Sequence, residues 1–359
     1  MVEAGPGPRR ERLAAWLAEH DLDATLVTRL VDVRYLTGFT GSNAAVLVRS
    51  DASATVATDG RYRDQVAEQV PDLPAVITRE VALDLASSVG SGSSLAFQAD
   101  DVSVSLHDQL KEATSGQLVR LGDVLRDLRQ VKDDGELALL REACAISDRA
   151  LAELLPDVAV GQTEREVARR LEWLMLEQGA EAVSFETIVA SGPNSAIPHH
   201  SPTDRPLGKG DLLKIDFGAL YGGYHADMTR SFVLGGPPTD WQQEVYLAVA
   251  AAQRAGREAL APGATAVEVD QAARSVLQEA GLAEHYTHGL GHGVGLEIHE
   301  APFLGPTSTD RLLAGVPVTV EPGVYLPGRG GIRIEDTLVV RRRTPELLTT
   351  TTRELLVLG

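Results

Sequence analysis

The chain has 359 residues, of which 43% are hydrophobic and 23% are charged, and its formal net charge is −18. This usage is globular, and the length exceeds one ordinary hydrophobic core, so two domains are expected. The acidic surface would repel phosphate backbones, which argues against a nucleic-acid partner.

The sequence has no pattern of a secreted or membrane protein. The basic pair Arg9-Arg10 has no continuous apolar run after it, so a signal peptide is not expected. No window of about 18 apolar residues occurs, so no membrane span is expected either. The cytoplasm is the predicted compartment. The one cysteine, Cys144, falls in a helical pattern and is expected to be a buried thiol.

The first third of the chain alternates helical and strand patterns, as an α/β domain does. It starts with an amphipathic helix, Arg10–His20, and a buried strand, ATLVT. The segments AAVLVRS and ATVATDG predict a hairpin. A helix (RYRDQVAEQV), two strands (AVITRE and LAFQAD) and a helix near Val104–Ala113 follow. The Asp-Asp-Gly turn at 133–135 marks a boundary, and the predicted domains are residues 1–128 and 129–359.

The second part of the chain contains a weak internal repeat. In each copy a long helix, Glu136–Leu155 or Thr239–Leu260, leads into a Gly-x-Thr-x-x-Glu-Val motif and a second helix. The motif is typical of a helix start with a capping box. The predicted boxes are Thr163 with Glu166 and Thr265 with Glu268, at an offset of 102 residues (163 to 265).

Each copy then ends in a pair of strands that carries two acids. Asp216 and Glu321 end the first strand of each pair, and Asp227 and Glu335 each precede a threonine by two residues in the return strand. The offsets are 105 residues (216 to 321) and 108 residues (227 to 335), close to the helical offset. Two α/β halves related in this way are expected to bring their four acids together.

The second return strand raises a question of charge. Gly330–Val340 reads as a single β-strand, in which alternation puts Arg333 and Glu335 on one face and two isoleucines on the other. Four ionised carboxylates at one place would repel, and each would lose several kcal/mol of hydration on burial. Two divalent cations would balance them, so the sequence predicts a dinuclear metal site.

Candidate nitrogen donors lie in the glycine-rich segment YTHGLGHGVGLEIHEAP, namely His288, His292 and His299. The segment is neither a G-x-G-x-x-G dinucleotide motif nor an H-E-x-x-H zinc motif. A proline-flanked loop adds His199 and His200, one of which is expected near the site.

The motifs IDFGALYGGYHADMTRSF, HGLGHGVGLEIHE, TVEPGVY and GIRIEDT resemble the proline-specific metallopeptidases of the pita-bread fold, aminopeptidase P and prolidase. The resemblance runs from about residue 136 to the TTRELL segment, and more loosely over the N-terminal region. It implies an α+β fold: a pita-bread catalytic domain with an internal pseudo-twofold duplication, preceded by a smaller, creatinase-like α/β domain.

The resemblance also implies the metal ligands. Asp216 would bind one cation, His292 and Glu321 would bind the other, and Asp227 and Glu335 would bridge the two. The resemblance implies Mn²⁺, with Co²⁺ or Zn²⁺ as alternatives, and the oxygen-rich ligand set agrees with this metal.

The resemblance further implies residues that act on the substrate. His288 would shuttle a proton or stabilise the oxyanion, His299 would contact the residue after the scissile bond, and His199 would lie near the substrate carbonyl or carboxylate. Arg333 matches the arginine two residues before the bridging glutamate. Glu321 would take the proton of the attacking water.

The expected activity is therefore cleavage of the Xaa-Pro bond at the N-terminus of peptides, by a metal-dependent aminopeptidase that works as a homodimer. The alternative is an Xaa-Pro dipeptidase. Many prolidases carry an arginine four residues after the histidine that matches His299, and Phe303 stands at that position, which favours the aminopeptidase. Arg333 or His199 could still hold a substrate carboxylate. A non-catalytic metal-binding scaffold is a third hypothesis, against which the intact ligand set argues.

Overall fold

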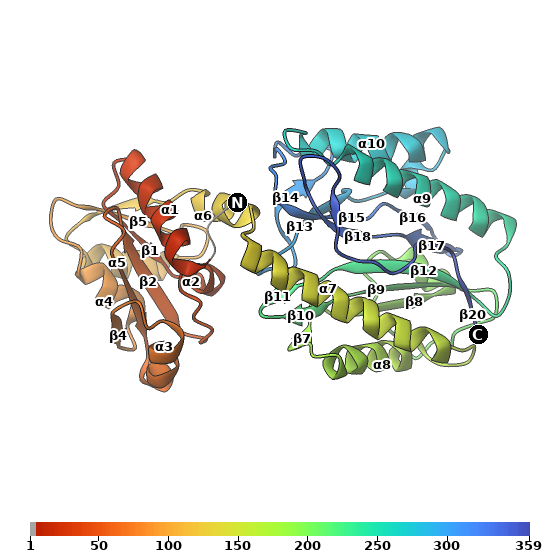
Figure 1. Ribbon diagram of the computed structural model, residues 1–359, viewed down its shortest axis with the longest axis horizontal. Coiled ribbons are helices and arrows are strands. Elements are labelled where there is room, and N and C mark those ends of the chain that lie inside the picture. The colour runs from red at the N-terminus through yellow and green to blue at the C-terminus, as the bar shows by residue number, and fades with distance from the viewer. Residues whose placement is uncertain (1–4) are drawn as a thin grey trace. The chain divides into compact units, whose positions relative to one another are not determined.

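The computed structural model describes residues 5–359; the first four residues, with which the predicted N-terminal domain begins, lie outside the described part. The chain forms two compact units that divide between Arg129 and Gln130 (Figure 1). Among the described residues, no helix is both long and apolar enough to cross a membrane.

The N-terminal unit is built on a six-stranded sheet with the order β4-β3-β2-β1-β5-β6. The predicted hairpin is confirmed, because β2 and β3 pair antiparallel, whereas β1 and β5 pair parallel. The strands are β1 (Ala24–Val27), β2 (Ala44–Arg49), β3 (Ala54–Thr58), β4 (Ala75–Ile77), β5 (Ser94–Phe97) and β6 (Gln117–Arg120). The helices are α1 (Pro6–Glu19), α2 (Leu30–Thr37), η1 (Gly60–Tyr62), α3 (Arg63–Gln69), α4 (Val81–Ser87), α5 (Val104–Ala113) and α6 (Val124–Gln130).

The second unit contains two larger sheets, with the orders β20-β12-β9-β8 and β14-β13-β15-β18-β19, and two small ones, β11-β10-β7 and β16-β17. In the first half the strands are β7 (Ala182–Val183), β8 (Ile188–Ser191), β9 (Leu212–Phe217), β10 (Ala219–Tyr221), β11 (Tyr224–His225) and β12 (Met228–Leu234). In the second half they are β13 (Gly291–Gly293), β14 (Glu300–Leu304), β15 (Pro317–Val320), β16 (Gly323–Leu326), β17 (Gly330–Arg333), β18 (Asp336–Val339), β19 (Glu346–Leu347) and β20 (Val357–Leu358).

Two helix pairs cover the strands of this unit from opposite sides (Figure 1). One pair is α7 (Asp134–Leu154) with α8 (Glu164–Glu177), and the other is α9 (Asp240–Ala259) with α10 (Ala266–Glu279). The remaining helical turns are η2 (Leu155–Asp157), η3 (Gly192–Ala196) and η4 (Ala283–His285). Each pair encloses its own hydrophobic core with the sheet of its half. Cys144 lies buried in α7, as expected.

The predicted duplication is confirmed by the helix starts and by the contacts between the halves. Both predicted capping boxes form, at the beginnings of α8 and α10. Thr229 Oγ1 of the first half donates to Glu335 Oε2 of the second at 2.6 Å. Reciprocally, Thr337 Oγ1 donates to the backbone oxygen of Asp227 at 2.8 Å. The start of each return strand, at Asp227 or Glu335, is therefore hydrogen-bonded to a threonine in the return strand of the other half.

The prediction that Gly330–Val340 is one strand is wrong. The chain changes partners within it, because β17 pairs with β16 whereas β18 pairs with β15. Glu335 lies at the break, where its backbone N–H donates to Thr229 O (3.1 Å). The predicted alternation of faces is nevertheless kept, since Ile332 and Ile334 lie in the hydrophobic core while Arg333 and Glu335 both contact Thr229 Oγ1. The break allows a carboxylate to point into the space between the two halves.

Candidate metal centre

Three of the five predicted metal ligands converge in the interior. Asp227 precedes β12, Glu335 precedes β18, and His292 is the middle residue of β13. One ligand atom from each lies within 4.8 Å of the others. The three residues are 4%, 1% and 8% exposed, respectively. Local sequence alone would not bury two acids so completely, and their place follows from the packing of the two halves.

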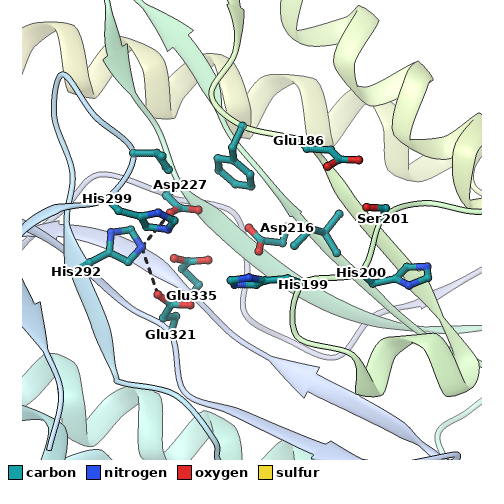
Figure 2. Close-up of a pocket in the computed structure, with 13 residues that line it drawn as sticks. Glu186, His199, His200, Ser201, Asp216, Asp227, His292, His299, Glu321 and Glu335 are labelled. Atoms are coloured by element: carbon teal, nitrogen blue, oxygen red, sulfur yellow. Dashed lines mark ion pairs between the residues drawn. The ribbon is translucent and has the colours of Figure 1, made fainter. Parts of the chain in front are cut away.

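The other two predicted ligands lie at the edge of this cluster. Glu321 follows β15, and its Oε1 is 3.4 Å from Nε2 of His292, while Asp227 Oδ2 is 3.5 Å from the same nitrogen. Asp216 ends up on the side of the cluster away from His292 (Figure 2). Its Oδ2 forms an ion pair with Nη2 of Arg333. All four carboxylates line one cavity.

The carboxylates of this cavity lack sufficient partners of their own. Asp216 Oδ1 and Glu335 Oε1 are buried and have no hydrogen-bond partner within residues 5–359. A buried acceptor left unpaired costs about 1–3 kcal/mol. Burial, followed by the neighbouring carboxylates, holds the pKa of Asp227 and of Glu335 well above its usual range. Burial also raises the pKa of Glu321 to about 7, although Arg333 opposes the shift.

The imidazole of His292 is neutral, which is the state in which it can bind a metal ion. Burial lowers the pKa of His292 to about 3, and nearby His299 adds to the shift, so the ring is neutral at physiological pH. Nδ1 of the ring donates to the oxygen of Gly293 (3.0 Å), which leaves Nε2 with its lone pair toward the carboxylates. Four carboxylates and one neutral imidazole suit divalent cations that favour oxygen ligands. The residues present therefore fit a metal site.

The predicted substrate residues lie around two adjoining cavities. The first, of about 240 Å³, contains the carboxylates with His199, His200, His292 and His299. The second, of about 430 Å³, is lined by His288, Phe303 and Arg333. His199, His292, His299 and Glu321 border both cavities.

His288 has partners for both ring nitrogens. Nδ1 donates to the oxygen of Gly289 (2.8 Å), and Nε2 lies 2.9 Å from the hydroxyl of Tyr325. Burial, with Arg333 as the next cause, lowers the pKa of His288 to about 4, so the neutral ring accepts from Tyr325 through Nε2. In this arrangement the ring has no free N–H for an oxyanion.

Two polar residues next to the ligands, Tyr325 and Thr319, were not singled out from the sequence. The hydroxyl of Tyr325 accepts from Arg333 Nη1 at 2.7 Å, so this tyrosine links Arg333 to His288. Thr319 Oγ1 accepts from the backbone N–H of His292 (3.0 Å) and donates to Glu321 Oε1 (3.3 Å). Thr319 shares the face of Glu321 by strand alternation, which is a signal that the sequence does offer.

The close approach of β13 to β15 requires glycine at position 291. A Cβ at Gly291 would lie 2.1 Å from the oxygen of Thr319. We expect Gly291→Ala to lower the free energy of unfolding by about 1–3 kcal/mol and to reduce metal retention, since the strand that carries His292 must move. The control is Gly305→Ala, whose Cβ would meet nothing closer than 3.9 Å. Urea unfolding and metal analysis of both variants test this, and equal behaviour would show that the approach is not constraining.

Comparisons with known proteins agree with this geometry. The model of the metallopeptidase family M24 matches residues 138–342, and that of the creatinase/prolidase N-terminal domain matches residues 9–131. The Xaa-Pro dipeptidase of Pyrococcus furiosus is 36% identical over 97% of this chain and 99% of its own length. Among solved structures, an Xaa-Pro dipeptidase from Bacillus anthracis superposes with a TM-score of 0.93 at 36% identity, covering 99% of this chain and 100% of the other. An X-Pro aminopeptidase from Thermotoga maritima gives 0.89 at 35% identity, over 97% and 99%. The expected pita-bread fold with its N-terminal α/β domain is thereby confirmed.

Proposed function

The chain belongs to metallopeptidase family M24, as a proline-specific metallopeptidase of the pita-bread fold, and on this premise we propose that it is an Xaa-Pro dipeptidase. The observation that carries the proposal is the 36% identity to the Pyrococcus furiosus Xaa-Pro dipeptidase across nearly the full length of both chains. This favours the alternative stated from the sequence over the aminopeptidase that was preferred there. The aminopeptidase is the second candidate, because Phe303 at the second cavity offers no charge to a substrate carboxylate.

Two divalent cations would be held by five residues, Asp216, Asp227, His292, Glu321 and Glu335, of which Asp227 and Glu335 would serve both. When bound, divalent cations supply Lewis acidity, which acidifies water and polarises a peptide carbonyl. Binding would also offset the burial and the mutual repulsion that hold the pKa of Asp227 and of Glu335 well above the usual range.

The chain's own groups handle the proton and the substrate. Glu321, which borders both cavities, takes the proton of the attacking water and passes it to the proline nitrogen, which leaves poorly until protonated. His288 and Tyr325 provide a second hydrogen-bonded route for a proton. His199 and His299 are exposed at the border of the cavities, where they contact the substrate on either side of the scissile bond.

A small peptide panel tests the proposal. We expect the metal-loaded protein to cleave Leu-Pro with a kcat/KM at least about tenfold above that for Leu-Pro-Gly, because a dipeptidase site recognises the free carboxylate of proline. Leu-Ala is the control for proline specificity and should be cleaved poorly. Faster cleavage of Leu-Pro-Gly would establish the aminopeptidase instead, and failure to cleave any proline peptide would refute the function.

Four finer points belong to the same proposal. Mn²⁺ is the proposed metal, supported by the oxygen-rich ligands. A homodimer and a cytoplasmic location are proposed from the family resemblance. The proposed domain division, 1–128 and 129–359, is supported by the compact units that divide between Arg129 and Gln130. Metal analysis of the isolated protein and light scattering test the first two.

A further inference from the structure

We propose that Glu164 is a positioning residue for the substrate, because its carboxylate fixes the loop 191–203 that carries His199 and His200 into the cavity. The inference rests on the proposed function, since it assigns His199 to the substrate. Glu164 is the first residue of α8 and is 0% exposed. Neither the metal ligands nor the proton-transfer groups include it.

One carboxylate gathers six hydrogen bonds from this loop. Oε1 of Glu164 accepts from the backbone N–H and hydroxyl of Ser191 (2.7 and 2.8 Å) and from Asn194 Nδ2 (3.0 Å). Oε2 accepts from the backbone N–H and hydroxyl of Thr203 (3.1 and 2.7 Å) and from Nε2 of His200 (2.9 Å). Burial acts to raise the pKa of Glu164, but these hydrogen bonds outweigh it and lower the pKa to about 2. The group is therefore ionised, and it ties both ends of the loop to one helix start.

The duplicated half shows that the helix does not need this carboxylate. At the offset of 102 residues, the counterpart of Glu164 is Ala266, which is also fully buried. The backbone is held alike in both copies: the N–H of Glu164 donates to Arg205 O (3.1 Å), and that of Ala266 donates to Asp310 O (2.9 Å). Both copies also have a complete capping box. What distinguishes the first copy is the loop that Glu164 holds.

The middle of the loop is anchored independently on the side of the metal cluster. Lys214 Nζ donates to two successive backbone carbonyls, the second being that of Pro198 (2.6 and 3.1 Å). Arg333 Nη1 donates to the same Pro198 oxygen (3.2 Å). The residue before His199 is thus fixed by the side chains of Lys214 and Arg333. The residue after it, His200, is fixed by Glu164. Between these two anchors, the exposed ring of His199 borders both cavities.

The test compares Glu164→Gln with Glu166→Gln in the metal-loaded full-length protein. An amide at 164 presents N–H groups to three donors, so that half of the contacts are lost. Glu166 lies in the same helical turn and is exposed, and its carboxylate accepts from the backbone N–H and the hydroxyl of Thr163, so its variant controls for the helix start. The readouts are KM and kcat on Leu-Pro, metal content, and amide hydrogen exchange of the peptide spanning 191–203.

For Glu164→Gln we expect KM to rise about tenfold or more, kcat to stay within about threefold, and exchange to increase within 191–203, with metal content unchanged. Glu166→Gln should match the wild type in all of these. Equal values for the two variants would overturn the inference, as would increased exchange throughout the chain with an unchanged KM. If Glu164→Gln does not fold, Thr203→Val removes a donor from the loop side and should shift KM and local exchange in the same direction. Absence of turnover by the wild type would refute the proposed function. The comparison of amide hydrogen exchange within 191–203 would then still show whether Glu164 holds the loop.

Discussion

Glu335→Gln is expected to lose at least about 10³-fold in kcat/KM on Leu-Pro and to bind less metal. The side chain is buried, Oε2 accepts from Thr229, and Oε1 has no partner among the described residues. An amide keeps the size of the side chain but removes the negative charge and one of the two ligand oxygens. Loss of groups that only support metal ligands typically costs 10–100-fold, so loss of a shared ligand should cost more.

The matched control for this variant is Glu268→Gln. Glu268 is an exposed glutamate of the capping box of α10 and does not line either of the two cavities, and its variant should keep wild-type kcat/KM. Metal content is measured after dialysis, together with turnover. If Glu335→Gln retained two metal ions per chain and turned over within about tenfold of the wild type, the assignment of Glu335 as a shared ligand would be wrong.

Removal of the metal is expected to abolish turnover and to lower the melting temperature, with a larger loss at high pH. Without cations, burial keeps the pKa of Asp227 and Glu335 well above the usual range and raises that of Glu321 to about 7. A carboxyl whose pKa is raised in the folded state contributes stability below its ordinary pKa near 4, and this contribution disappears as the pH rises through the folded value. In the loaded protein we expect the same groups to be ionised and to hold the cations.

The difference in melting temperature between loaded and metal-free protein should therefore widen between about pH 5.5 and pH 8. The lowered pKa of His292 does not affect this difference, because the ring is neutral in both forms. Metal at about 100-fold above its Kd adds about 2.7 kcal/mol of stability per site. Differential scanning fluorimetry across this range, with and without Mn²⁺, measures the effect. A difference that stays constant or narrows toward pH 8 would mean that these carboxyls do not hold the metal.

The features that were predicted best from the sequence are those that depend on residues close together along the chain. The capping boxes at Thr163 and Thr265 depend on a residue three positions away, and both form as predicted. The repeat also indicated that Asp227 and Glu335 would meet, because equivalent positions in two packed halves face each other. That inference needed only the spacing of the acids and the pattern of the strands.

What sequence missed depends on contacts between distant segments. The break before Glu335 follows from a change of strand partner, which no local pattern announces. The pairing of Arg333 with Asp216 joins residues 117 positions apart. Glu164 looks like an ordinary first-turn acid of a helix, and only the fold brings the loop of His199 onto it.

The central claim is that carboxylates from both duplicated halves enclose two divalent cations. Anomalous diffraction from crystals soaked in Mn²⁺ tests it most directly. Two anomalous peaks are predicted about 3.5–4 Å apart, with oxygens of Asp227 and Glu335 touching both. Peaks elsewhere in the chain, or carboxylates in this cavity without an anomalous peak between them, would contradict the account.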